Sequence, residues 1–381
     1  MTDLSERAEQ TPPSGIRRFF EIAEEMDDVV SLGVGEPDFS APWPARKAAI
    51  EALERGQTSY TSNRGRRDLR EAVAAHVTRY GHDYDPESEI LVTTGVSEAM
   101  DLAMRALVDP GDVVAVAEPA YISYGPDATF SGGDVLPVPT RAEEEFRLTY
   151  DALERAGADR ADVLVFCYPN NPTGAVMDAT HLAEVAEFAR EHDLFVLADE
   201  VYAALTYHGE HDSIATLPGM RERTLVFNGF SKAYAMTGLR LGYAMGPPEV
   251  VDAMNRIHQY TMLSAPTTAQ AAALEALESC DDAVVDMREQ YDRRRRFVLS
   301  RFREMGLECF EAKGAFYVFP AVPGDDEAFA EALLREAEVA VVPGSVFGEG
   351  GAGHVRVSYA RSLPELREAT NRIEDFLADY R

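Results

Sequence analysis

Seven short apolar runs, most of them rich in β-branched residues, constrain the fold of this 381-residue chain more than any other feature. Several intervals between them carry helical apolar spacing, for example residues 97–107 and 180–191. Strands that alternate with helices indicate a mostly parallel sheet covered on both faces. We therefore predict an α/β fold with a mostly parallel seven-stranded sheet, and ligands beyond the carboxyl ends of its strands. The runs are residues 90–93, 113–117, 135–138, 162–166, 194–198, 224–227 and 241–245.

The two ends of the chain depart from this pattern. Residues 267–280 and 281–305 have helical patterns, and the segments beyond them, including GAFYVFP and HVRVSYA, indicate a smaller α+β lobe. We expect a large domain over residues 46–280, a small domain made of residues 15–45 and 281–381, and a polar, poorly ordered arm at residues 1–14. The length by itself also allows two or three separate domains.

Charge and hydropathy limit the partners. The chain has 66 acidic and 36 basic residues and a formal net charge of −30, so its surface repels nucleic acid and anionic lipid. No apolar run approaches the roughly 20 residues that span a bilayer, and residues 1–15 lack an apolar signal core, so we expect a cytoplasmic protein. Strong acidity with few lysines resembles proteins from a high-salt cytoplasm, where salt screens self-repulsion. We expect folding and activity to need high salt.

Cysteine and histidine spacing predicts no metal site. Cys167, Cys280 and Cys309 show no paired or metal-like spacing, and an odd, low count fits a reducing compartment. Cys167 lies in an apolar run, which favours an inert buried thiol. His208 and His211 lack a carboxylate or cysteine constellation and are interpreted as loop histidines.

The segment GFSKAYAMTGLRLGY, residues 229–243, holds Lys232 among small, aromatic and apolar residues, with Arg240 eight positions later. An amine must lose its proton to attack a carbonyl carbon, and burial beside an arginine favours the neutral amine through desolvation and like-charge repulsion. Lys232 is therefore a candidate nucleophile toward a carbonyl group. The alternative is an exposed lysine near a helix start.

This segment resembles the pyridoxal-phosphate attachment signature of the class I/II aminotransferases, which have the aspartate-aminotransferase fold (fold type I). Further matches extend from about Gly33 to Ala360. The resemblance implies a pyridoxal-phosphate-dependent transaminase of amino-acid metabolism that moves an amino group from an L-amino acid to a 2-oxo acid such as 2-oxoglutarate. It also implies a homodimer with active sites at the interface. The matching residues are Ser231, Lys232, Met236, Thr237, Gly238, Arg240, Gly242 and Tyr243.

The resemblance implies a phosphate cup at the residues that follow the first predicted strand of the sheet. In such a turn the free N–H groups of a helix start face an anion. Arg240 clamps the same phosphate, and Tyr60 reaches it from the neighbouring subunit. The alternatives are helix capping by the serine of the cup and a packing role for Tyr60. The cup residues are Gly95, Val96 and Ser97.

The resemblance also implies residues that hold the cofactor ring. Tyr121 stacks on the pyridine face, with core packing as the alternative. Asp199 follows an apolar strand, and its buried carboxylate keeps the pyridine nitrogen protonated, which makes the ring an electron sink. A helix N-cap is the alternative for this aspartate. Tyr202 and Asn171 hydrogen-bond the phenolic oxygen, and Lys232 carries the cofactor and shuttles the α-proton.

The substrate α-carboxylate is implied to bind the backbone of Gly35, together with Asn171 and Arg356. Arginine fits a carboxylate bidentately, and Arg356 alternates with valines on a predicted strand. An ordinary turn and a surface arginine are the alternatives for Gly35 and Arg356.

The amino donor is less constrained. Dicarboxylate-specific relatives use a basic residue where this chain has Ser97 and Tyr260, which favours an aromatic or other neutral donor. Aspartate stays open, because Arg17, Arg18 or Arg256 could substitute. A lyase or synthase of the same fold stays open as well. A cofactor-binding regulator without catalysis is disfavoured, since no basic DNA-binding domain is present.

Overall fold

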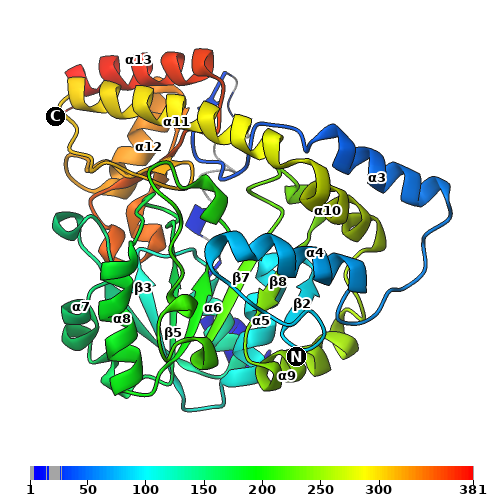
Figure 1. Ribbon diagram of the computed structural model, residues 1–381. Coiled ribbons are helices and arrows are strands. Elements are labelled where there is room, and N and C mark those ends of the chain that lie inside the picture. Colours follow the sequence, from blue (N-terminus) through cyan, green and yellow to red (C-terminus); the bar gives the residue numbers. More distant parts are fainter. Residues whose placement is uncertain (1–3, 14, 17–25, 27, 381) are drawn as a thin grey trace.

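The computed structural model describes residues 4–13, 15, 16, 26 and 28–380, and a seven-stranded sheet with helices on both faces lies at its centre (Figure 1). The strand order is β2-β8-β7-β6-β5-β3-β4, and within this sheet only β8 runs antiparallel to its neighbours. The predicted mostly parallel seven-stranded sheet is confirmed. The strands are β2 (Ile90–Thr93), β3 (Val113–Glu118), β4 (Asp134–Pro139), β5 (Val163–Cys167), β6 (Phe195–Asp199), β7 (Thr224–Gly229) and β8 (Gly242–Met245).

Helices follow most of the strands and cover the sheet from both sides (Figure 1). A further helix, α3 (Trp43–Glu54), packs on α10 at one edge of the molecule. The helices around the sheet are α4 (Arg67–Val77), α5 (Gly95–Leu107), α6 (Tyr124–Ser131), α7 (Tyr150–Ala156), α8 (Ala179–Glu191), α9 (Pro248–Thr261) and α10 (Thr267–Ser279).

Strand β5 shows why the sheet must be covered on both faces. All five of its residues are buried, and they alternate between two hydrophobic cores. Val165 and Cys167 pack in the core that contains residues of α5, α6 and α9, whereas Leu164 and Phe166 pack in the core of α7 and α8. A strand buried on both faces needs an apolar residue at every position. This is why the strands are visible in the sequence as continuous apolar runs.

A second lobe is built from the C-terminal part of the chain and a short N-terminal strand. It contains a three-stranded antiparallel sheet, β11-β12-β9, and a parallel pair in which β1 (Val30–Ser31) lies beside β10 (Val339–Ala340). The long helix α11 runs across the top of the molecule in Figure 1, from α10 to this lobe. The other elements are β9 (Tyr317–Val318), β11 (Val342–Pro343), β12 (Val355–Ser358), α11 (Asp281–Glu304), α12 (Asp326–Ala337) and α13 (Leu363–Asp379).

The predicted arm at residues 1–14 contains the short helix α1 (Glu6–Gln10), and Arg7 in this helix donates to the carbonyl of Phe130. Within the part of the chain that the structure describes, no helix is both long and apolar enough to cross a bilayer.

Candidate active site

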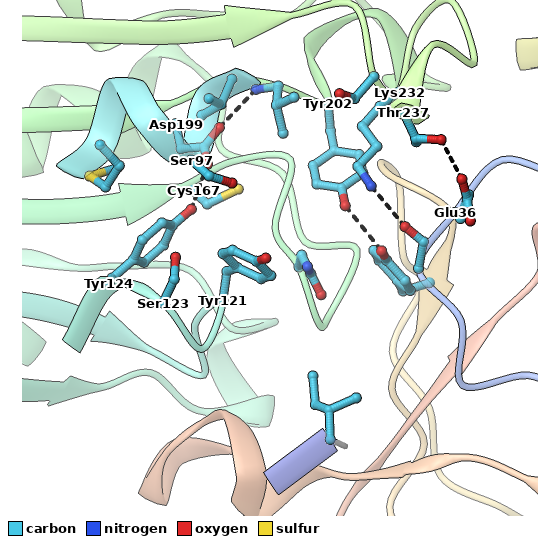
Figure 2. A pocket seen from close by; sticks show the side chains of 18 of the residues that line it. Glu36, Ser97, Tyr121, Ser123, Tyr124, Cys167, Asp199, Tyr202, Lys232 and Thr237 are labelled. Atoms are coloured by element: carbon cyan, nitrogen blue, oxygen red, sulfur yellow. Dashed lines mark hydrogen bonds between the residues drawn. The ribbon is translucent and has the colours of Figure 1, made fainter. Parts of the chain in front are cut away.

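A cavity of about 410 Å³ lies where the carboxyl ends of several sheet strands face the second lobe (Figure 2). Its lining includes most of the site residues predicted from the sequence, although they come from segments far apart in the chain. Gly95 lies directly beside the lining, whereas Tyr60 is 80% exposed and lies outside it. The predicted residues that line the cavity are Gly35, Val96, Ser97, Tyr121, Asn171, Asp199, Tyr202, Ser231, Lys232, Arg240 and Arg356.

Lys232 is partly buried, and its Nζ donates a 2.7 Å hydrogen bond to the carbonyl oxygen of Gly35. Burial lowers the pKa of this amine to about 8, and the charges of Arg356 and Arg240 act in the same direction, against Glu36 and Asp199. At pH 8 about half of such amines are neutral, compared with roughly 0.3% at a pKa of 10.5. The exposed-lysine alternative is wrong, and the amine is suited to nucleophilic attack.

Asp199 is the last residue of β6, and it is 5% exposed. Tyr124 donates a 2.6 Å hydrogen bond to its Oδ2, drawn as a dashed line in Figure 2, and the backbone N–H of Val201 donates to its Oδ1 at 3.1 Å. Burial raises the pKa of the carboxyl group to about 6, against the lowering effects of these two bonds and of Lys232. The helix N-cap alternative is wrong, because the next helical element is the short 3-10 helix Ala203–Leu205, and its N-cap is Tyr202.

The Gly95–Ser97 turn and Arg240 lie face to face. Gly95 has φ +81°, a conformation that favours glycine, and a Cβ at this position would lie 2.8 Å from the Arg240 guanidinium group. A Cβ on Gly242 would lie 2.7 Å from the backbone nitrogen of Val96. Helix α5 begins at this turn with Thr94, not Ser97, at its N-cap, so the capping alternative for Ser97 is wrong. The free N–H groups of the helix start and the arginine form a cradle for an anion.

Arg356 lies on β12 and is 3% exposed. It donates to Asn171 Oδ1 at 2.9 Å and to the carbonyl oxygen of Gly33 at 2.6 Å. Its Nε is buried and has no hydrogen-bond partner among the described residues. A buried unsatisfied donor on a charged group is costly, and an incoming carboxylate would satisfy it. The surface-arginine alternative is therefore wrong.

The remaining predicted side chains lie around the same space. Tyr121 is 37% exposed, and its ring meets the ring of Tyr124 edge-on at 5.9 Å, so it is a cavity wall and not a core residue. The hydroxyl of Tyr202 lies 3.0 Å from that of Tyr317. Figure 2 shows Tyr202 and Lys232 side by side, and Tyr121 on the side of the cavity nearer Tyr124.

Several cavity residues were not predicted as site residues. Tyr124 follows Tyr121 by three positions in the motif EPAYISY, and Tyr317 is part of GAFYVFP, so each had a weak local signal as an aromatic near a predicted strand. Glu36 accepts a hydrogen bond from Thr237 at the rim. Cys167 also lines the cavity, and burial raises its pKa, which agrees with the predicted inert thiol.

Other candidates lie elsewhere. Tyr260 is 88% exposed, Arg256 is exposed on α9, and neither lines the cavity. Arg17 and Arg18 lie outside the described residues. His211 lies 2.9 Å from Glu200 and is buried, so its interpretation as an ordinary loop histidine is incomplete. No cluster of histidine, cysteine and acidic residues in the described chain suits a metal ion.

Comparisons with known proteins agree with this geometry. Residues 27–373 match the family described as aminotransferase class I and II. The aromatic-amino-acid aminotransferase 2 of Thermococcus litoralis and the aspartate aminotransferase of Pyrococcus abyssi are each 43% identical over 383 residues, which cover 99% of this chain and 98% of either relative. The solved structure of aspartate aminotransferase from Thermus thermophilus with maleate has a TM-score of 0.93 and 41% identity, and the match covers 99% of this chain and 100% of that one. The chain therefore belongs to the class I and II aminotransferases and is a pyridoxal-phosphate-dependent transaminase with the fold of aspartate aminotransferase.

Proposed function

We propose that this transaminase takes its amino group from an aromatic or other neutral L-amino acid and passes it to a 2-oxo acid such as 2-oxoglutarate. One observation carries the choice of donor. Among the described residues, the cations of the cavity wall are Lys232, Arg240 and Arg356. Each has a proposed task at the cofactor or at the α-carboxylate, so none is left for a second carboxylate on the donor side chain.

The rest of the wall supports the same donor class. Ile16, Val34 and Tyr317 add apolar and aromatic surface to the cavity, and Ser97 stands where a dicarboxylate-specific relative would have a basic residue. Aspartate is the second candidate, because relatives of equal identity are named as aromatic-amino-acid and aspartate aminotransferases. Arg17 and Arg18, which follow Ile16 in the chain, are the residues through which aspartate would be held.

The residues of the cavity fit pyridoxal phosphate. Because residue 95 is a glycine, the space between this turn and Arg240 is open to an anion, whereas a Cβ would fill it. Arg240 itself forms no ion pair with a described carboxylate. Asp199 is a buried carboxylate, and no cation of the described residues is in contact with it. When bound, the cofactor supplies an electron sink for the bond broken at the α-carbon of the amino acid.

Each residue then has a separate task. Lys232, whose pKa burial lowers to about 8, anchors the cofactor and moves the α-proton, while Asp199 holds the proton on the ring nitrogen. Arg356 orients the substrate carboxylate through its guanidinium fork. The other proposed contacts are Gly35 and Asn171 to the carboxylate, Asn171 and Tyr202 to the phenolic oxygen, Tyr121 to the ring face, and Gly95, Val96, Ser97 and Arg240 to the phosphate, with Ser231 as a further cofactor-binding residue.

We propose further that the enzyme is a homodimer. Tyr60 is 80% exposed, and the described chain has further exposed apolar surface at large side chains such as Trp43, Leu53 and Tyr260. Such a surface suits a second copy of the chain, and Tyr60 would contact the neighbour's phosphate. Light scattering would detect the dimer, and a monomeric, fully active enzyme would exclude this role for Tyr60.

The proposed organisation is a cofactor-binding large domain (46–280), a small domain (15–45 and 281–381) and an N-terminal arm (1–14), in a protein of a high-salt cytoplasm. The pairing of β1 with β10 supports the discontinuous small domain. The net charge of −30 supports the salt requirement, since dense negative charge is screened by salt. A melting temperature that is equal in low and molar potassium chloride would contradict it.

A panel of amino donors tests the proposed function. Tyrosine, phenylalanine, tryptophan, leucine, alanine and aspartate would each be supplied with 2-oxoglutarate in molar potassium chloride. We expect the largest kcat/KM for an aromatic or other neutral donor, at least tenfold above aspartate, because an unpaired second carboxylate in the cavity is costly. A preference for aspartate would overturn the donor class. Product formation that needs no 2-oxoglutarate would instead indicate a lyase.

A further inference from the structure

Tyr317 contacts both the cofactor side and the substrate side of the cavity, and the proposed mechanism gives it no task. It lies on β9 and pairs with Ser358 of β12, the strand that also carries Arg356. The side chain is 1% exposed. A Cβ on Gly35 would collide with its hydroxyl group, so the Gly35 backbone lies directly against it.

Two side chains predicted to touch ligands hold Tyr317 from opposite ends. Its ring lies 4.7 Å from the guanidinium carbon of Arg356, within the range of a cation–π interaction. Its hydroxyl oxygen lies 3.0 Å from the hydroxyl oxygen of Tyr202. Its position is therefore fixed by the proposed carboxylate-binding residue and by the proposed ligand of the phenolic oxygen together.

The direction of the hydroxyl pair decides what Tyr202 can do. Two hydroxyl groups carry two protons, and one is used between them. For the Tyr317 hydroxyl, the only hydrogen-bond partner among the described residues is Tyr202. If Tyr202 were the donor, it would offer only lone pairs to the cavity and could not donate to the phenolic oxygen of the cofactor. If Tyr317 is the donor, the proton of Tyr202 stays available to an acceptor in the cavity.

We infer that Tyr317 is a positioning residue: it donates its hydrogen bond to Tyr202 and so directs the Tyr202 proton at the phenolic oxygen of the cofactor. This inference rests on the proposed role of Tyr202. A donor that is itself hydrogen-bonded is polarised and donates more strongly. Because the same ring packs on Arg356, Tyr317 also links the orientation of the Tyr202 hydroxyl to the residue proposed to bind the substrate carboxylate.

Two substitutions separate the hydroxyl from the ring. Tyr317→Phe removes the hydroxyl and keeps the ring over Arg356, whereas Tyr317→Leu removes both. With the hydroxyl gone, the phenolic oxygen is stabilised less, so the lysine-bound cofactor holds its titratable proton more tightly. For Tyr317→Phe we expect the pH midpoint of the bound-cofactor absorbance band to rise by roughly half a unit and kcat to fall about tenfold, with KM nearly unchanged. For Tyr317→Leu we expect the same changes and a KM about tenfold higher.

Tyr359→Phe is the matched control. Tyr359 is also a fully buried tyrosine in the same lobe, and its hydroxyl donates to the carbonyl of Ala315 and lies 3.3 Å from the Tyr207 hydroxyl, away from the cavity. It should lose thermal stability without any shift of the absorbance midpoint. Equal midpoints and equal kcat in wild type and Tyr317→Phe would overturn the inference.

A double variant tests whether the Tyr317 hydroxyl acts through Tyr202. Tyr202→Phe should raise the absorbance midpoint, and adding Tyr317→Phe to it should give no further rise, because the two hydroxyls act as one unit. Independent, additive shifts would show that Tyr317 does not act through Tyr202. The titration does not require transamination, so a wild-type protein that binds the cofactor but transfers no amino group would contradict the proposed function without touching this inference.

Discussion

Asp199 and Glu200 are adjacent residues at the end of β6, and both are buried, yet their pKa values move in opposite directions. Burial raises the pKa of Asp199 to about 6. Burial acts in the same direction on Glu200, but the charges and hydrogen bonds of His211 and His82 outweigh it and hold its pKa at about 2. The Nε2 atoms of these histidines lie 2.9 and 3.7 Å from Glu200 Oε2.

The difference lies in what each carboxylate contacts. Glu200 meets two histidines and accepts a 2.5 Å hydrogen bond from Ser213, so its own chain supplies its partners. Asp199 faces the cavity, where Tyr124 and the N–H of Val201 donate but no cation of the described chain is in contact. The negative charge of this buried carboxylate is therefore not balanced by a neighbouring positive charge. Glu200 therefore serves the fold, and Asp199 is suited to hold the protonated ring nitrogen of the cofactor.

Lys232→Ala has the largest expected effect, and it tests the surroundings of Asp199, the carboxylate that faces the cavity. Lys232 lowers the pKa of Asp199 through its charge and is the proposed anchor of the cofactor. Without it we expect kcat to fall by about 10⁴-fold or more, and the lysine-bound cofactor absorbance band to vanish. Circular dichroism should show an intact fold. A variant with full turnover would refute the assignment of Lys232.

Asp199→Asn should lower activity and stabilise the apoprotein at the same time. We expect kcat to fall by about 10³-fold, because an amide cannot hold the ring nitrogen in its protonated form. In the apoprotein, the raised pKa means that the native state binds this proton more tightly than the unfolded state. Stability is therefore lost as pH rises from about 4 to about 6, and asparagine removes that loss.

The measurement is the melting temperature of the apoprotein with and without the substitution. At pH 7 we expect the asparagine variant to be more stable by at most about 3 kcal/mol, from a shift of roughly two pKa units. At pH 4 the advantage should largely disappear. A lower melting temperature for the variant at pH 7 would mean that Asp199 already has a compensating partner in its own chain.

The sequence predicts one side of this comparison well and the other poorly. Asp199 and Lys232 each follow a strand with a continuous apolar run, Lys232 also lies in the long signature of residues 229–243, and both line the cavity as predicted. Glu200 is paired with residues on two loops, and nothing local indicates that His82 and His211 meet at one carboxylate.

Tertiary packing also explains the cavity residues that sequence reasoning missed. Tyr317 meets Tyr202 across 115 positions, because β9 belongs to the second lobe, whereas Tyr202 follows β6 of the seven-stranded sheet. Tyr124 reaches Asp199 across 75 positions through the start of α6. Such contacts depend on how elements dock and leave no periodic signal in the chain. The strands were predictable because burial on both faces imposes a composition on every position.

Glu200→Gln should have the smallest effect on catalysis and a clear effect on stability. A neutral amide loses the interactions that lower the pKa of the Glu200 carboxyl group from 4.5 to about 2, so we expect the protein to lose about 3 kcal/mol of unfolding free energy at pH 7. The pKa of Glu200 is lower in the folded than in the unfolded chain, so its contribution is present above about pH 4.5 and is lost as pH falls toward 2. The destabilisation should therefore shrink in acid.

The activity of Glu200→Gln completes the comparison with Asp199→Asn. Glu200 is not part of the cavity lining, so we expect the folded variant to keep kcat within about threefold and the cofactor band unchanged. Thermal unfolding from pH 3 to 7 and single-donor kinetics on the same preparation would measure both properties. The two carboxylates differ in role only if Asp199→Asn lowers turnover while raising apoprotein stability, and Glu200→Gln lowers stability alone. Parallel losses of both properties in the two variants would mean that the end of β6 acts as one electrostatic unit, with Glu200 tuning Asp199 through their direct repulsion.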